Sequence, residues 1–196
     1  AGEKIFEQAG SRPWTSAQIP PFAQWVHENQ KPLDLLVEAS RRPRCYFPST
    51  SLINNQRETI LNMLLSGVQG SREASRSLPA RAMWHLGEGR PDEAWQDLFA
   101  VHRIGRLVAQ GLTLVEQLVG IAIDGAACNG TQTLLHHGNL TTEQVQQIRR
   151  DLAALPPFNG MARALDQGER LVVVDLLVQF AGSGEKSRRQ MSEELE

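Results

Sequence analysis

One segment has a helical repeat regular enough to set the fold class of the chain. Between Pro91 and Gln110 the apolar side chains recur every three or four residues, which is the spacing of one face of an α-helix. Gly89 ends the segment before it, Pro91 suits a first helical turn, and Asp92 and Glu93 place negative charge at the positive end of the helix dipole. The segment therefore predicts an amphipathic helix with one broad buried face.

Similar periodicity predicts helices along most of the remaining chain. Pro79 is expected to kink or delay one of these helices, and Lys31–Pro32 and Pro156–Pro157 are expected to interrupt the helical pattern. About seven helices joined by short loops are typical of an all-α domain of antiparallel hairpins, stacked as a bundle or a short α-α superhelix. The further helices are expected over residues 22–30, 33–40, 52–68, 71–87, 112–136, 143–155 and 159–180.

The run Leu171–Val178 is ambiguous between a strand and a helix. Its sequence, LVVVDLLV, has the β-branched content of a buried strand, but it continues the helical pattern that precedes it. No second run of similar quality offers a partner, and a lone strand leaves its backbone hydrogen bonds unmade. The sequence therefore favours a helix here.

Length and charge limit the class of protein. The chain has 196 residues, 20 basic against 22 acidic side chains and a formal net charge of -2, so its totals show no nucleic-acid footprint. Its two cysteines, Cys45 and Cys128, are too few for a disulfide scaffold. We expect a single helical domain over residues 1–182, followed at 183–196 by a polar tail or a truncated helix.

Two stretches resemble known helical proteins. Ala82, the run Leu86–Gly89, the run Asp92–Ala94 and Leu98 resemble the core of a tetratricopeptide hairpin, which implies two antiparallel helices joined by a short turn. The stretches from Trp14 to Pro48 and from Asp92 to Gly130 resemble uncharacterised helical domains of planctomycete bacteria. That second resemblance implies no activity. It suggests a hydrophobic anchor ahead of this domain, and with it a cell-envelope or exported location.

Polar side chains of the expected helix 112–136 gather on one stripe. At 100° per residue they fall within a sector about 60 to 80° wide, while the rest of the helix is apolar nearly all round. Small residues in such a stripe allow a second helix to approach closely, and a carboxylate among apolar side chains needs a partner. The stripe consists of Thr113, Gln117, Gly120, Asp124, Ala127, Cys128 and Thr131, with Glu116 at its margin.

Two interpretations of this stripe remain open. In the first it is a buried seam in which Glu116 and Asp124 pair with Arg81, Arg103 or Arg106. In the second it is the floor of a ligand groove, in which the carboxylates recognise a cation, a sugar or a peptide amine. The candidate ligand-binding residues are then Glu116, Gln117, Asp124, His102 and Arg103.

No spacing in the sequence indicates catalysis, a metal or a cofactor. His-x-x-x-His, His-Glu-x-x-His and Glu-x-x-His are absent, as are Gly-x-Ser-x-Gly and the phosphate-binding glycine loops. His136 and His137 suit the capping of a helix C-terminus, and Cys128 suits a small buried side chain. The sequence therefore favours a protein that is not an enzyme, and it names no catalytic residue and no metal ligand.

A basic turn is the remaining candidate site. Arg41, Arg42 and Arg44 stand beside Tyr46 and Phe47, and guanidinium forks next to aromatic rings can hold phosphate or carboxylate groups. The competing interpretation is that these arginines only cap the preceding helix.

Together these patterns predict a non-catalytic binding or scaffold module. We expect it to recognise a protein or peptide through a concave helical face with arginine and aromatic anchors, with a homodimer as a further expectation. No nucleic-acid partner is expected, and membrane contact is expected only through an anchor outside this chain. The alternative is a small-molecule or hydrolytic site at Glu116, Asp124 and His102.

Overall fold

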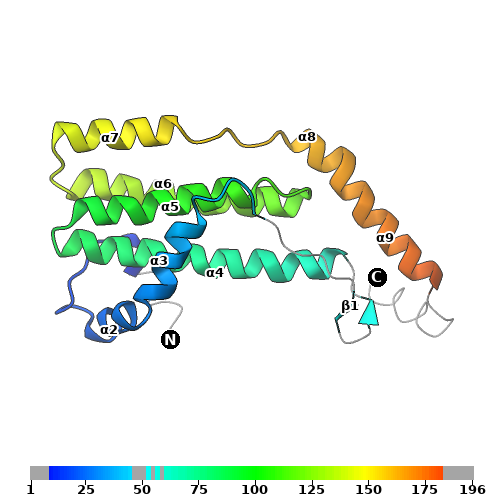
Figure 1. The fold of residues 1–196 in the computed structure, drawn as a ribbon, viewed down its shortest axis with the longest axis horizontal. Coiled ribbons are helices and arrows are strands. Elements are labelled where there is room, and N and C mark those ends of the chain that lie inside the picture. The colour runs from blue at the N-terminus through cyan, green and yellow to red at the C-terminus, as the bar shows by residue number, and fades with distance from the viewer. Residues whose placement is uncertain (1–8, 46–51, 54–55, 58–59, 183–196) are drawn as a thin grey trace.

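The fold is an array of long helices. It was obtained as a computed structural model, which describes residues 9–45, 52–53, 56–57 and 60–182. The all-α fold class predicted from the sequence is confirmed (Figure 1). The elements are α2 (Pro20–Glu28), α3 (Gln30–Ala39), α4 (Ile60–Gly87), α5 (Pro91–Val108), α6 (Leu114–His137), α7 (Thr142–Ala153), α8 (Met161–Arg163), the π-helical turn η1 (Ala164–Gly168) and α9 (Glu169–Gly182).

Three long helices form the centre of the molecule. α4, α5 and α6 run antiparallel in succession, α7 lies along the same array, and the short α3 crosses it (Figure 1). One buried cluster surrounds Trp14, Phe22 and Met83, where α2 packs on α4 and α5. A second surrounds Leu78 and Val101 and extends to α6. α5 contributes side chains to both clusters, so packing on two sides fixes its position. The polar side chains that it carries are fixed with it.

Two expectations at the start of α4 are wrong. Residues 52–53 and 56–57 form a small antiparallel ladder, in which β1 (Leu52–Ile53) pairs with β2 (Gln56–Arg57). α4 then begins at Ile60 and runs without interruption to Gly87, which joins the two helices expected over 52–68 and 71–87. Pro79 lies inside it and is buried. An interior proline costs about 3 kcal/mol, and the buried side chains around it, Leu78, Ala80, Ala82 and Met83, offset that cost.

Proline also proves compatible with the start of α3. The helix begins at Gln30, so Pro32 occupies its first turn and does not interrupt it. The break between α2 and α3 falls instead at Asn29, whose φ of -103° and ψ of 15° are not helical. The two helices expected over 22–30 and 33–40 are therefore present, and the boundary between them lies at Asn29 and not at Lys31–Pro32.

α5 and α6 pack closely because both present glycine where they cross. A Cβ atom added to Gly120 would lie 2.5 Å from the carbonyl oxygen of Gly105 and 2.7 Å from the backbone nitrogen of Ala109. The small residues predicted to face a neighbouring helix therefore do so. This close approach brings the polar side chains of α5 and α6 together.

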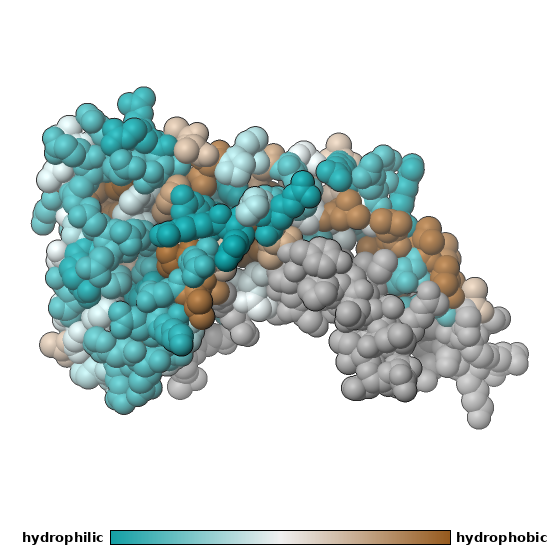
Figure 2. Space-filling model, viewed as in Figure 1, coloured by the Kyte–Doolittle hydropathy of each residue, from teal (hydrophilic) through white to brown (hydrophobic). Residues whose placement is uncertain are grey.

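The C-terminal segment leaves the array as a diagonal arm (Figure 1). Residues 171–178 are helical within α9, as the sequence favoured. The arm is apolar on its surface: of the large apolar side chains that are exposed in the described residues, most lie between Met161 and Phe180. Figure 2 shows this apolar surface along the arm. Among the described residues, no helix combines the length and the apolar composition needed to cross a bilayer.

Candidate functional site

The carboxylate of Glu116, a candidate ligand residue, forms its hydrogen bonds at the start of its own helix. Its backbone N–H donates to Thr113 Oγ1 at 3.3 Å, and its carboxylate accepts from the Thr113 backbone N–H at 3.0 Å and from Thr113 Oγ1 at 2.8 Å. These contacts form a capping box that starts α6. The Thr-x-x-Glu spacing at 113–116 could have identified this role in the sequence.

Asp124 lies away from Glu116 and faces α5. The two residues are eight positions apart on α6, or about 12 Å along its axis, so the structure does not bring the two carboxylates together. Asp124 Oδ1 lies 2.8 Å from His102 Nδ1, and Arg106 Nη2 donates to Asp124 Oδ2 at 3.4 Å. The interpretation of the stripe as a seam is therefore confirmed for the pair Asp124 and Arg106.

His102 and Asp124 belong to a larger cluster on this seam. His102 is 2% exposed, and its Nε2 lies 3.2 Å from Thr131 Oγ1. Cys128, one turn after Asp124 on α6, completes a group in which one ligand atom from each of His102, Asp124 and Cys128 lies within 4.8 Å of the other two. The sequence analysis placed His102 and Asp124 in one candidate site, but it did not predict Cys128 as a ligand, because the approach of Cys128 to His102 depends on how α5 and α6 pack.

The two other candidates in the seam lie apart from this cluster. Gln117 is buried, and its Oε1 has no hydrogen-bond partner among the described residues. Arg103 points away from α6 and stacks on Phe99, with its guanidinium carbon 4.0 Å from the ring centroid. Of the five residues predicted to line one ligand groove, the structure therefore brings only His102 and Asp124 together.

Arg103 joins instead the second candidate site, the basic turn after α3. A hollow of about 290 Å³ lies between that turn, α5 and the connection that follows α7. We name it the arginine groove. Arg44 lies outside it. The groove is lined by Ser40, Arg41, Arg42, Pro43, Phe99, Arg103, Arg106, Leu107, Gln110, Ala154, Leu155 and Pro156.

A buried charged cluster at the junction of α3, α4 and α5 was not predicted. Arg81 donates to both carboxylate oxygens of Asp97, at 2.8 and 2.6 Å, and to Asp34 Oδ1 at 2.7 Å. Burial raises the pKa of Asp97 to about 6, although Arg81 acts in the opposite direction. Burial also opposes the charge of Arg81, but the hydrogen bonds to Asp97 and Asp34 outweigh it and raise the pKa of Arg81. At neutral pH the cluster is an ion pair.

His85 borders this cluster. Its Nε2 lies 3.7 Å from Asp97 Oδ2, and its Nδ1 lies 3.1 Å from Glu93 Oε2 without the geometry of a hydrogen bond. Burial and the positive charges of Arg90 and Arg81 lower the pKa of His85 to about 4. A polar hollow of about 230 Å³ opens beside these side chains.

The lowered pKa of His85 predicts a loss of stability in acid. The unfolded chain takes up the His85 proton near pH 6.5 and the folded chain only near pH 4, so stability falls as the pH falls through this range. The raised pKa of Asp97 has the opposite effect on stability: as the pH falls from about 6 to 4, the folded chain takes up the Asp97 proton before the unfolded chain does, which favours the folded chain. We expect the His85→Gln variant to gain stability relative to the unsubstituted protein when urea unfolding is repeated at pH 6.5, 5.5 and 4.5. His137→Gln, an exposed histidine on α6, is the control, and equal behaviour of the two variants would contradict the assignment.

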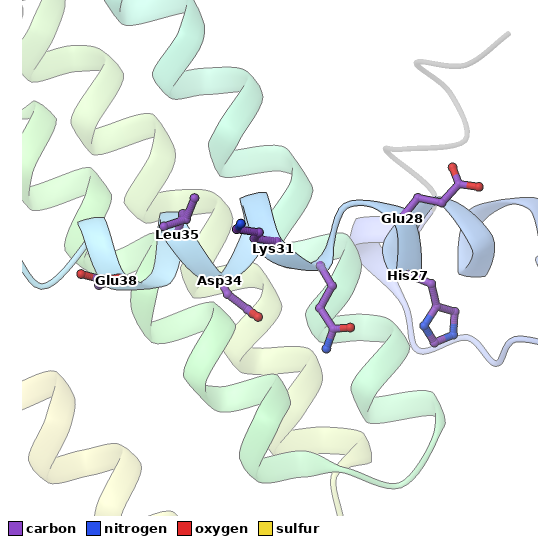
Figure 3. Close-up of a pocket in the computed structure, with 7 residues that line it drawn as sticks. His27, Glu28, Lys31, Asp34, Leu35 and Glu38 are labelled. Carbon is purple, nitrogen blue, oxygen red and sulfur yellow. The ribbon is translucent and has the colours of Figure 1, made fainter.

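A third hollow, of about 470 Å³, lies on the outer side of α2 and α3. Its side chains include Lys31, Asp34 and Glu38 and point in different directions (Figure 3). They do not converge on a common point, so the hollow has no arrangement that would hold a ligand.

The fold and these sites define an all-α helical protein with an arginine groove, a mixed His/Asp/Cys cluster and a buried ion-pair cluster. Comparison with protein-family models, with curated proteins and with solved structures gives no match for this chain.

Proposed function

We propose that this chain is a non-catalytic binding module that holds an acidic segment of a partner protein in its arginine groove. The observation that carries the proposal is the charge of the groove. Four guanidinium groups line it, from Arg41, Arg42, Arg103 and Arg106, and no carboxylate is among the described residues that line it. Arginine forks of this kind match carboxylates in shape and charge.

Arg106 pairs with Asp124 at 3.4 Å, but the other guanidinium groups of the groove are poorly neutralised by the protein itself. Burial lowers the pKa of Arg103, the charge of Arg41 lowers it further, and Asp151 offsets this only in part. Arg42 has an exposed partner in Glu38 at 3.4 Å, and such a contact is weak in water. An incoming carboxylate would relieve the repulsion between Arg41 and Arg103, so the groove favours an anionic ligand.

Two of the arginines are held in place by aromatic rings. Arg103 stacks on Phe99 at 4.0 Å, and Arg106 stacks on Phe158 at 3.7 Å while its Nη1 donates to the Pro156 carbonyl at 3.3 Å. Side chains that are ordered before binding lose less conformational entropy when the ligand arrives. The aromatic residues expected beside the basic turn, Tyr46 and Phe47, lie outside the described residues, and Phe99 and Phe158 support the proposal in their place.

We further propose that the hairpin of α4 and α5 packs as in a tetratricopeptide unit. Gly89, at φ 74°, makes the turn between the two helices, and the small residues Ala82 and Ala94 are fully buried at their contact. The planctomycete-type resemblance, the homodimer and the location in the cell envelope stay predictions. The exposed apolar arm of α9 supports a role in association, because a helix that is apolar all round is normally covered.

The alternative function, a small-molecule or hydrolytic site at Glu116, Asp124 and His102, has less support. It requires the two carboxylates to act on one ligand, whereas Glu116 is engaged by Thr113 about two helical turns from Asp124. We therefore prefer the binding module.

The proposal is tested with a fluorescein-labelled hexaglutamate peptide, whose binding to the full chain is followed by fluorescence anisotropy. We expect saturable binding that weakens as salt is raised, because the contacts are ionic. We expect Arg103→Gln and Arg41→Gln each to weaken binding about tenfold, since each removes charge-assisted hydrogen bonds. Arg103→Lys should weaken it as well, because the ammonium group cannot form the fork.

Arg170→Gln is the matched control. Arg170 lies on α9, is exposed, and pairs with Asp166 at 3.4 Å, so its loss changes the net charge equally without touching the groove. Equal weakening by Arg170→Gln and Arg103→Gln would show that only net charge matters. That result, or an absence of binding at low salt, would overturn the proposal.

A further inference from the structure

We propose that His102, Asp124 and Cys128 form a binding site for a divalent transition-metal ion such as Zn²⁺ on the seam between α5 and α6. The three side chains supply imidazole nitrogen, carboxylate oxygen and thiolate sulfur, which are the ligand types that Zn²⁺ takes in proteins. One ligand atom from each lies within 4.8 Å of the others. None of the three proposed ligands lines the arginine groove, although Arg106 lines that groove and also contacts Asp124.

The hydrogen bonds around His102 leave a place for a proton or a metal ion beside its Nδ1 atom. Thr131 Oγ1 donates its single proton to the Ala127 carbonyl at 2.8 Å, so it can only accept from His102 Nε2, 3.2 Å away. The N–H of a neutral imidazole is then at Nε2, and the lone pair at Nδ1 points to Asp124 Oδ1 at 2.8 Å. Two acceptors at this distance repel each other unless a proton or a metal ion lies between them.

The atoms next to the proposed ligand atoms already have partners of the kind found around metal sites. His102 Nε2 is oriented by Thr131, and Asp124 Oδ2, the oxygen opposite the proposed ligand atom, accepts from Arg106 at 3.4 Å. Such outer contacts fix the ring and the carboxylate in protein metal sites. The Asp124 carboxylate and the thiolate that metal binding creates balance the two charges of the metal ion, so the occupied site carries the single positive charge of Arg106.

The positions of the three residues suit an ion that enters from solvent. Asp124 and Cys128 are one turn apart on α6 and project from one face, while His102 comes from α5. Cys128 is exposed, so its side chain can turn toward the ion. On binding, the metal–sulfur bond forms, the thiol proton is released to solvent, and a fourth coordination position stays open to water.

The required adjustment is small. In a tetrahedral zinc shell, nitrogen and oxygen ligands at about 2.1 Å from the metal lie roughly 3.4 Å apart, compared with 2.8 Å between His102 Nδ1 and Asp124 Oδ1. A shift of about half an ångström in the Asp124 side chain accommodates the ion, together with a rotation of Cys128.

The test is a titration of the full, reduced chain with Co²⁺, which reports a cysteine ligand through a thiolate-to-cobalt charge-transfer band. We expect the band to saturate at one equivalent and to be displaced by Zn²⁺. Cys128→Ser should abolish the band, and Asp124→Asn should weaken binding at least tenfold. Cys45→Ser is the matched control, since Cys45 is the other exposed thiol, and it should leave the titration unchanged.

A second measurement distinguishes a loss of metal binding from a loss of folding in these variants. Circular dichroism of each variant checks its helix content, and Zn²⁺ should raise the thermal midpoint of the unsubstituted protein and of Cys45→Ser but not of Cys128→Ser. No charge-transfer band at millimolar Co²⁺, or equal loss in Cys45→Ser and Cys128→Ser, would overturn the proposal. In that event a proton alone occupies the space between His102 and Asp124. The outcome does not depend on hexaglutamate binding, so this proposal and the proposed function can fail separately.

Discussion

Replacing Arg81 with methionine is expected to lower the free energy of unfolding by about 3 to 5 kcal/mol, which is the usual cost of removing one partner of a buried ion pair. Arg81 holds both oxygens of Asp97, at 2.6 and 2.8 Å, and Asp97 is only 2% exposed. Without Arg81 the carboxylate is left in the interior with no compensating charge. The measurement is urea unfolding at pH 7, where the ion pair is formed.

Two further variants separate this effect from the general loss of an arginine. Arg42→Met removes an exposed arginine whose contact with Glu38 is 3.4 Å long, so we expect a change of less than about 0.5 kcal/mol. The double variant Arg81→Met with Asp97→Leu should recover most of the lost stability, because both charges are then gone. A double variant as unstable as Arg81→Met would show that packing, and not the unpaired charge, causes the loss.

Substitution of Gly120 by alanine is expected to destabilise the protein by about 1 to 3 kcal/mol, as is usual for overpacking. The new methyl group would lie 2.5 Å from the Gly105 carbonyl oxygen and 2.7 Å from the Ala109 backbone nitrogen. Both are backbone atoms, so neither can move aside without separating α5 from α6. We expect a lower midpoint in thermal and in urea unfolding.

Gly125 provides the matched control on the same helix. It is exposed, and apart from its chain neighbours and the adjacent backbone of α6, no atom lies within 4 Å of the position where its Cβ would be. Gly125→Ala should therefore stabilise the protein by up to about 1 kcal/mol through helix propensity alone. Equal destabilisation by the two substitutions would contradict the close packing of α5 on α6.

The crossing of α5 and α6 positions residues of both proposed sites. α5 presents His102 to α6 and Arg103 to the arginine groove, and Arg106 contacts Asp124 in the seam while it also lines the groove. If Gly120→Ala separates the helices, it should weaken Co²⁺ binding as well as stability. Arg103, in contrast, lies outside the metal cluster, which is why its substitution tests the groove alone.

The sequence predicted most of the helices because their signals are local. Proline at the start of α5, the Thr-x-x-Gln capping box of α7 and the apolar spacing within each helix depend on residues only a few positions apart. The errors occurred where distant packing overrides local preference. Pro79 lies inside α4 and does not delay its start, because its neighbours are buried in the core of the bundle.

The candidate sites could be predicted only in part. The basic turn at Arg41 and Arg42 was visible in the sequence, but its association with Arg103, about sixty residues later, was not. The carboxylate of Glu116 was expected either to pair with an arginine in a buried seam or to line a ligand groove, although a capping box a few residues long accounts for it. The ion pair of Arg81 with Asp97 was missed, because no local pattern links the two residues.

By itself, then, the sequence determined which segments are helical and which face of each is apolar, since those properties arise from hydrogen bonds and side-chain contacts within a few residues. Only the tertiary structure decided which charges meet. Gly105 and Gly120 set how closely α5 and α6 approach, and that approach places His102 against Asp124. Such pairings depend on where two helices cross, and the energy of that crossing is spread over the whole interface.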